Sequence, residues 1–458
     1  MNITRRLFMK NGAIALASIG LEPIAGPMFL RQTAFAAETT AQKRKKTLIC
    51  IFQRGAADGL SIVAPHGDPD LYRHRSTLAV QRPGRANAQN AAIDLDGFFG
   101  FHPALAPFVP IFRSGHLAVV HACGSPDTTR SHFDAQDYME SGAPGNKRIA
   151  DGWLSRTVLA CPEDRAKLAT AAASPFRAVA LGGDHGLPRS LQGDAGALAI
   201  PDLHTFGIGV PEMAQAGRRA GNGNRRRGAM LAEPEMQSAG AAAVTGGFES
   251  LYENAVGDVL HGTGKESFEA IAVLNKLTPG SYAPASGAVY PAGRFGESLK
   301  QVAQLVKANV GVEVAFAEMG GWDTHTNQPA RLTQQLREFG QGVAALYNDL
   351  GDAMSDVVIL TMSEFGRTAR QNGNNGTDHG HATCFFALGG AVNGGKVLGK
   401  WPGLAPEQLY ENRDLALSTD FRAVFGEVAV RHLGAQGLAK IFPGYAGTPA
   451  DFRGVMRA

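Results

Sequence analysis

The chain has 458 residues, of which 44% are hydrophobic and 19% charged, and its formal net charge is +3 at pH 7. This length and apolar content allow a large core, which suits one large α/β domain with insertions or two domains, and we favour one. The charge is close to zero and basic residues do not interleave with aromatic ones, which argues against nucleic acid or an anionic membrane as the partner.

The first 36 residues have the pattern of an export signal. The string TRRLFMK at residues 4–10 resembles the twin-arginine motif. Residues 11–30 contain Glu22 and two prolines, so they are too short and too weakly apolar for a membrane span. The string AFA at residues 34–36 is typical of a cleavage site. We therefore predict a twin-arginine signal peptide over residues 1–36 and a periplasmic or otherwise exported protein, although an ordinary frayed basic tail is the alternative.

Removal of this segment changes the charge of the protein. It takes away four basic residues and one acidic residue, so 44 basic and 41 acidic residues become 40 of each in the mature domain, residues 37–458. We expect a neutral mature surface and no membrane span in the mature chain. The partner is then a small molecule or another protein, and not a nucleic acid.

Five short apolar runs rich in β-branched residues have the composition of buried strands. In chain order they are residues 47–52, 116–121, 177–182, 312–316 and 357–360. Apolar residues spaced by three and four predict one long amphipathic helix over residues 330–354. Repeated strand, helix, strand units predict an α/β fold with a mostly parallel central sheet and helices on both faces.

An arginine-rich region and the cysteines carry no catalytic pattern of their own. Residues 215–243 are rich in Gly, Ala and Arg, which favours an exposed mobile insertion over a folded binding arm. The cysteines have neither Cys-x-x-Cys nor zinc-finger spacing, and we expect Cys50 and Cys384 to be buried as small hydrophobic residues. A disulfide is compatible with export, but the sequence does not choose its partners.

Candidate metal ligands are concentrated between residues 320 and 381. The strings GGWDTH (320–325), SEFGR (363–367) and TDHGH (377–381) follow one another. The first two directly follow predicted strands, where open α/β sheets bind ligands. Carboxylates mixed with imidazoles are ligands for zinc, manganese or iron, so we predict a divalent metal site whose ion (zinc, manganese, iron or calcium) stays open. The candidate ligands in this segment are Asp323, His325, Glu364, Asp378, His379 and His381.

Each of these residues also has a structural alternative. Asp323 and His325 would suit an ordinary turn, and Glu364 would suit an ion pair with Arg367 one helical turn on. One of His379 and His381 would suit a role as an outer hydrogen-bond donor to a ligand.

Three residues before this segment are further candidates. Asp58 follows the first predicted strand in a Gly-rich turn. It is either a metal ligand or an ordinary Asp-Gly turn residue. Ser131, in the string RSHFD (130–134), stands at a predicted helix start as a nucleophile or as the helix cap. His132 is a ligand or a packing and outer-shell residue. The string Asp184-His185, in a loop before a proline, is a weaker candidate.

The order of these segments resembles the alkaline phosphatase and sulfatase superfamily. In that superfamily an Asp after the first strand, a hydroxyl nucleophile at a helix start and later Asp and His pairs hold one or two metals. The matching residues here are Asp58, Ser131, Asp323, His325, Glu364, and Asp378 with His379 or His381. The resemblance implies an alkaline phosphatase-like fold. It departs at Phe365, where those enzymes have His in the string SDHG, so a second metal site is weakened, absent or rebuilt from His132 or His379.

A closer resemblance is to an exported family called domain of unknown function 1501. Its marks are the twin-arginine start and the strings GAADG (55–59), SHF (131–133), PRSLQG (188–193), GWDTH (321–325), EFGR (364–367) and GTDHG (376–380), followed by two Gly-Gly pairs at 389–390 and 394–395. These marks cover nearly the whole mature chain. The family has no settled reaction, so the resemblance implies a fold and not an activity.

Two hypotheses about function follow from these resemblances. In the first, the protein is an exported metal-dependent hydrolase of small anionic phosphate or sulfate esters. Ser131 would attack the phosphoryl or sulfuryl centre, and Arg130 or Arg367 would hold its anionic oxygens. In the second, the protein is a catalytically reduced binding or assembly protein that keeps the fold and acts with an exported protein partner.

Overall fold

The computed structural model of the protein describes residues 45–84, 90–161, 174–183, 186–204, 206, 273 and 282–457. They belong to one compact unit, Lys45–Ala458. The predicted signal peptide (1–36), the Asp184-His185 string and the predicted insertion (215–243) lie outside the described residues.

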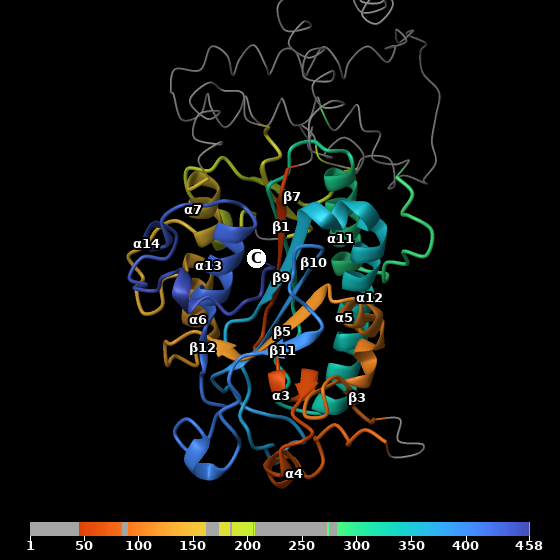
Figure 1. Ribbon diagram of the computed structural model, residues 1–458, viewed down its shortest axis with the longest axis vertical. Helices are drawn as coiled ribbons and strands as arrows, with labels where there is room; N and C mark the ends of the chain where they lie inside the picture. Colours follow the sequence, from red (N-terminus) through yellow and green to blue (C-terminus); the bar gives the residue numbers. More distant parts are fainter. Residues whose placement is uncertain are drawn as a thin grey trace, which may run out of the picture. The chain divides into compact units, whose positions relative to one another are not determined.

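Nine strands of the described part form one large sheet (Figure 1). Their order across the sheet is β11-β5-β10-β9-β1-β8-β6-β7, and β12 pairs with β5 beside this path. The strands are β1 Thr47–Gln53, β5 Leu117–Gly124, β6 Ala178–Leu181, β7 Leu198–Ile200, β8 Val314–Met319, β9 Val357–Met362, β10 Thr383–Gly389, β11 Lys396–Leu398 and β12 Thr419–Asp420.

Most neighbouring strands of this sheet are parallel. β1 lies between β8 and β9 and is parallel to both, and β6 is parallel to β8 and β7. Only β10 among these strands runs antiparallel to its neighbours, β5 and β9. β5 therefore points the same way as β9. The predicted mostly parallel sheet is confirmed, and each of the five predicted strands overlaps one of its strands.

Helices cover both faces of the sheet (Figure 1). Ile49 and Ile51 of β1 pack in one core cluster with residues of the helices α5, α11 and α12. Leu48, Cys50 and Phe52 pack in the opposite cluster with residues of α6, α7, α13 and α14. Successive side chains of a strand point to opposite faces, so a strand covered on both sides needs an unbroken apolar run. The helices are α3 Gly59–Ile62, α4 Pro69–His74, α5 Val109–Arg113, α6 His132–Ser141, α7 Trp153–Leu159, α11 Arg294–Lys307, α12 Gln328–Leu350, α13 Phe421–Arg431 and α14 Leu438–Ile441.

Smaller elements connect these layers. The strands β2 Val63–Ala64, β4 Gly100–Phe101 and β3 Ile93–Asp94 form a second, antiparallel sheet. The 3-10 helices are η1 Pro103–Phe108, η2 Arg189–Leu191, η6 Gly351–Asp356, η7 Pro406–Gln408 and η8 Pro449–Asp451.

The long predicted helix is confirmed as α12, but it ends four residues earlier than predicted. Gly351 at its end has φ 50° and ψ −123°, a conformation that a residue with a side chain rarely adopts. The chain continues as the 3-10 helix η6 instead of extending α12. Leu336, Phe339 and Leu346 of the predicted stripe are buried, as an amphipathic helix packed on a sheet requires.

The four cysteines are all buried, and the structure joins none of them in a disulfide. Cys50 and Cys384 lie in β1 and β10, as predicted, and burial raises the pKa of both thiols. None of the described helices combines the length and apolar character that crossing a bilayer requires.

Candidate metal centre

One edge of the large sheet gathers the predicted motifs. The parallel strands β8, β1 and β9 end at this edge, so the loops after Met319, Gln53 and Met362 lie next to one another. β5 ends at the same edge and leads to α6, and β10 begins there because it is antiparallel. Five segments distant in the sequence thus meet where open α/β sheets bind ligands.

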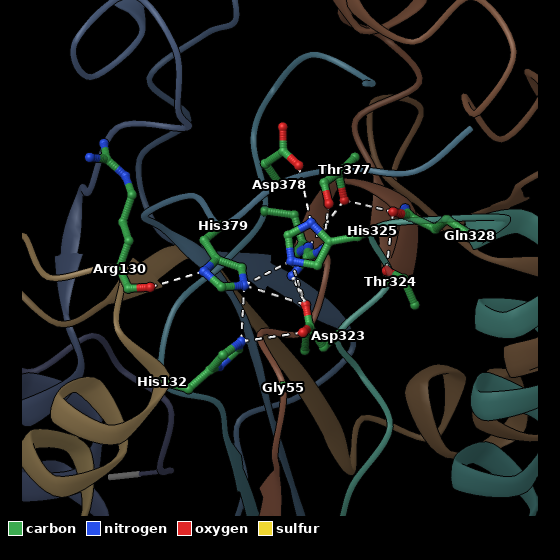
Figure 2. A network of polar contacts seen from close by, with 12 residues as sticks. Gly55, Arg130, His132, Asp323, Thr324, His325, Gln328, Thr377, Asp378 and His379 are labelled. Atoms are coloured by element: carbon green, nitrogen blue, oxygen red, sulfur yellow. Dashed lines mark hydrogen bonds and ion pairs between the residues drawn. The ribbon is translucent and has the colours of Figure 1, made fainter. Parts of the chain in front are cut away.

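Three imidazoles converge at this edge (Figure 2). His132 is the first residue of α6, His325 follows β8 in the loop before α12, and His379 lies in the loop before β10. The Nε2 atom of His379 lies 3.0 Å from Nε2 of His132 and 3.0 Å from Nε2 of His325.

The other ring nitrogen of each imidazole has a fixed acceptor. His132 Nδ1 donates to Glu364 Oε1 at 2.8 Å. His325 Nδ1 donates to Asp378 Oδ1 at 3.0 Å, and His379 Nδ1 donates to the carbonyl oxygen of Arg130 at 2.9 Å. Because ionised carboxylates and carbonyl oxygens only accept, each Nδ1 carries a proton, and a neutral ring then has its lone pair on Nε2. In neutral rings the lone pairs of His132 and of His325 therefore both face that of His379, which is unfavourable unless a proton or a cation lies between them.

Asp323 adds a carboxylate to the three imidazoles (Figure 2). Its Oδ1 lies 3.0 Å from His325 Nε2 and 3.4 Å from His379 Nε2, and its Oδ2 lies 3.6 Å from His132 Nε2. Ligands at about 2.0–2.1 Å from a tetrahedral zinc ion lie about 3.3 Å apart. The observed separations of 3.0 to 3.6 Å agree with that spacing. His132, Asp323 and His379 form a group whose ligand atoms all lie within 4.8 Å of one another, and His325 lies beside it.

Arg367 holds Asp323 in this position. Its Nη1 donates to Asp323 Oδ1 at 2.7 Å, its Nε donates to Thr377 Oγ1 at 3.1 Å, and its Nη2 donates to the carbonyl oxygen of Thr377. Burial alone would raise the pKa of Asp323, but the hydrogen bond and charge of Arg367 hold that pKa below its usual value. The carboxylate is therefore ionised at neutral pH and suited to a cation. The guanidinium of Arg367 is buried, so it supports Asp323 and does not reach into solvent for an anion.

Glu364 orients the imidazole of His132 through a hydrogen bond. Its Oε1 accepts hydrogen bonds from His132 Nδ1, Gln136 Nε2 and the amide of Gly55. Burial would raise the pKa of Glu364, but the hydrogen bonds from His132 and Gln136 keep it lowered. The same hydrogen bond raises the pKa of His132. A carboxylate that orients a ligating imidazole is a usual outer partner of metal sites, and Asp378 has this relation to His325.

Phe365 packs against the imidazoles. Its ring centroid lies 5.0 Å from that of His132 and 5.1 Å from that of His379. The side chain that departs from the phosphatase pattern thus helps to fix the two ring planes, and it offers no metal ligand.

The structure does not bring Asp58 to the imidazoles. Its carboxylate is 1% exposed and accepts two hydrogen bonds from Arg75, at 2.6 and 2.9 Å, and one from Gln328 at 2.5 Å. A carboxylate already neutralised by a buried guanidinium is a poor competitor for a second cation.

Arg130 and His381 also differ from their predicted places, whereas Ser131 lies at the start of a helix, as predicted. The guanidinium of Arg130 binds Glu411 and Asp414, and only its carbonyl oxygen faces the cluster. His381 stacks on Tyr410 at 4.6 Å, and burial lowers its pKa. Ser131 occupies the cap position of α6 and is exposed, but its hydroxyl accepts no capping hydrogen bond.

The cluster is open to solvent. The side chains of His132 and His379 are 25% and 23% exposed, and those of His325 and Asp323 are 41% and 43% exposed. Catalytic metal sites keep a position open for water or substrate, whereas structural sites are closed by protein ligands. Three ligands from His132, Asp323 and His379 would leave such a position, and His325 as a fourth ligand would fill it.

Comparisons with known proteins give a family match but no activity. No curated protein matches the chain. Among solved structures, the chain is similar to the C-terminal periplasmic domain of EcEptC from Escherichia coli in complex with Zn, with 8% identity, a TM-score of 0.31, and coverage of 76% of this chain and 74% of that chain. This likeness is too weak to assign a fold family or a reaction. Residues 268–440, which include Asp323, His325 and His379, match the model of the family described as "Protein of unknown function (DUF1501)".

Proposed function

We propose that this protein is a metal-dependent hydrolase of phosphate or sulfate esters, with one divalent ion held by His132, Asp323 and His379. One observation carries the proposal. The Nε2 atoms of His132 and His379 and the carboxylate of Asp323 converge while the Nδ1 atoms of both imidazoles are bonded to fixed acceptors. When the rings are neutral, this arrangement has facing lone pairs, and a cation between them satisfies these lone pairs and the carboxylate at once.

The donor set narrows the choice of ion. Imidazole nitrogen with a single carboxylate suits zinc, manganese or iron. Calcium prefers about six to eight oxygen ligands, so it fits this site poorly. We propose a single ion. Asp58 is bound by Arg75, and Glu364 is bound by His132 and Gln136, so neither carboxylate is suited to a second ion.

Ser131 is the proposed nucleophile. It lies between Arg130, whose carbonyl oxygen binds His379, and His132, whose ring belongs to the cluster. Its hydroxyl forms a new ester bond to phosphorus or sulfur as the alcohol of the substrate leaves, and water then hydrolyses this ester and frees Ser131. The ion would polarise the ester oxygens and lower the pKa of bound water. Arg367 fixes Asp323, and Phe365 fixes the ring planes of His132 and His379.

The alternative function is a closed metal site in a binding protein. The observation that favours it is the position of His325 Nε2, 3.0 Å from both His379 Nε2 and Asp323 Oδ1. If His325 moved into the group of His132, Asp323 and His379, four protein ligands would complete a tetrahedral zinc shell and leave no place for a substrate. The protein would then present a metal-stabilised surface to an exported partner.

Substitution of Ser131 separates the two functions. We expect Ser131→Ala to lower the turnover of zinc-loaded protein on aryl phosphate or aryl sulfate esters by at least about a thousandfold, with zinc still bound, because the nucleophile is lost and the ligands are not. Release of the aryl alcohol and metal content by plasma mass spectrometry measure the two effects. Ser355→Ala is the control, because Ser355 is also exposed but lies in η6, before β9 begins at the opposite edge. A zinc-loaded wild type without turnover on either ester class would instead favour the binding protein.

We also propose that the twin-arginine pathway exports the chain, and the TRRLFMK and AFA strings support this. We expect Arg5→Lys combined with Arg6→Lys to retain an uncleaved chain in the cytoplasm, while the wild type reaches the periplasm and begins at Ala37. Cell fractionation and N-terminal sequencing measure both. Arg31→Lys, in the same segment but outside the pair, should be exported normally, and normal export of the paired variant would exclude this route.

A further inference from the structure

A buried ion pair lies behind the metal centre. Asp58 and Arg75 are 1% and 0% exposed, and they form two hydrogen bonds, Arg75 Nη1 to Asp58 Oδ2 and Arg75 Nη2 to Asp58 Oδ1. Arg75 Nη2 and Nε also donate to the carbonyl oxygens of Thr368 and Ala369, which precede the TDHGH segment. The proposed hydrolysis does not use this pair, although it is the most deeply buried ion pair near the site.

Gln328, the first residue of α12, connects this ion pair to the centre, and its contacts with Thr324 and Thr377 are drawn in Figure 2. It is 1% exposed, and its Nε2 donates to Asp58 Oδ2 at 2.5 Å. Its Oε1 accepts hydrogen bonds from Thr377 Oγ1 at 2.6 Å and Thr324 Oγ1 at 3.1 Å. Because a carboxylate can only accept, the amide nitrogen of Gln328 must face Asp58 and its oxygen must face the two threonines.

Thr377 passes this orientation on to Arg367. With its proton donated to Gln328, the hydroxyl of Thr377 presents a lone pair, which accepts from Arg367 Nε at 3.1 Å. Arg367 Nη1 then donates to Asp323 Oδ1 at 2.7 Å. Every bond in the sequence Asp58, Gln328, Thr377, Arg367, Asp323 therefore has one allowed direction. The two carboxylates at the ends, which only accept, and the guanidinium of Arg367, which only donates, set these directions.

We infer that Gln328 is a positioning residue for the metal centre, because it fixes Arg367 and, through Arg367, the carboxylate of Asp323. This inference rests on the proposed metal site. It gives Asp58 a role as the anchor of the relay, in place of the predicted role as a ligand. The loop that carries Asp323 and the loop that carries Thr377 belong to different strands, so the amide of Gln328 also sets their distance.

The test compares the zinc affinity of the full chain with that of Gln328→Met and Thr377→Val. Each substitution removes the hydrogen bonds of one residue in this sequence at nearly constant side-chain volume. We expect each to weaken zinc binding at least about tenfold, as the loss of an outer partner does in other metal sites. The zinc affinity of the double variant should lie within about twofold of that of the weaker single variant, because both substitutions act through Arg367. Cobalt(II) provides a spectroscopic signature, since altered ligation by Asp323 shifts its visible absorption bands.

Gln301→Met is the matched control. Gln301 is 2% exposed, lies on α11, and uses its amide to bind Asp202 and the backbone of Leu203. It should lose stability without losing zinc affinity. Zinc affinity of Gln328→Met equal to that of wild type or of Gln301→Met would overturn the inference.

The proposed function can fail separately. If the wild type binds no zinc, crystal structures of the metal-free wild type and of Gln328→Met decide the inference. Displaced Arg367 and Asp323 side chains in the variant would support it, and unchanged side chains would overturn it.

Discussion

Replacement of His379 by alanine is expected to remove zinc from the protein. His379 Nε2 lies within 3.4 Å of Asp323 and within 3.0 Å of both other imidazoles, so it is the ligand atom shared by the whole cluster. Binding free energies of about 10–16 kcal/mol for structural zinc, divided among three or four ligands, correspond to about 2.5–5 kcal/mol each, which is roughly a hundredfold or more in affinity. Competition with a chromogenic chelator measures the dissociation constant of wild type and variant.

His381→Ala is the matched control for this experiment. It removes the same side chain two residues further along the same loop, where the ring stacks on Tyr410 outside the cluster. Its zinc affinity should stay within about twofold of the wild type. An equal loss in both variants would show that the loop, and not a specific imidazole, governs binding. An unchanged affinity in His379→Ala would remove the proposed centre.

The strands and the edge that carries the site could be predicted from the sequence. Residues 47–52 and 357–360 are unbroken apolar runs because β1 and β9 are covered by helices on both faces. Parallel strands bring their carboxyl ends together, so the placement of the GGWDTH and SEFGR strings after strands already predicts that they meet.

The role of each residue at that edge depended on contacts that the sequence does not show. Glu364 and Asp378 were predicted as ligands, yet in the structure each accepts a hydrogen bond from the Nδ1 of an imidazole. Which of a carboxylate and an imidazole faces the ion depends on side-chain rotamers, and these depend on packing around Phe365 and Gln136. His132 carried a signal of a ligand in its place beside Ser131 at a helix start, but a packing role fitted that signal equally well.

Asp58 shows a second limit. Its string GAADG after the first strand has the pattern of a metal ligand, and nothing local distinguishes it from one. The distinguishing residue is Arg75, at the end of α4, which folds back onto Asp58 through a turn of the chain. Gln328 is more remote still, 270 residues away in the sequence. The only signal in the sequence for this change of role is an arginine, Arg75, 17 residues after Asp58.

Loss of the buried Arg75 is expected to lower the free energy of unfolding far more than loss of the exposed Arg73. Arg75→Met leaves the carboxylate of Asp58 buried without its ion-pair partner, with Gln328, Ser61 and the charge of Arg367 as its remaining compensation. Removal of one partner of a buried ion pair destabilises by about 3–5 kcal/mol. Arg73→Met is the matched control two residues earlier on α4. Arg73 is 74% exposed and pairs with Asp70, so its loss should cost less than about 1 kcal/mol. Urea unfolding with a chelator present, which removes any contribution of bound metal, measures both.

The pH dependence separates an unpaired charge from a simple loss of packing. Burial would raise the pKa of Asp58, but in the wild type the charge and hydrogen bonds of Arg75 hold it below its usual value. Its stabilisation is then present above the unfolded pKa of about 3.9 and is lost only as the pH falls through the lower folded pKa. In Arg75→Met burial dominates, the folded pKa lies above the unfolded one, and protonation stabilises the fold as the pH falls. The deficit of Arg75→Met relative to wild type should therefore be largest near pH 7.5 and shrink towards pH 4.5. A deficit independent of pH would mean that Arg75 stabilises the fold by its packing and backbone hydrogen bonds, and that Asp58 does not need its charge.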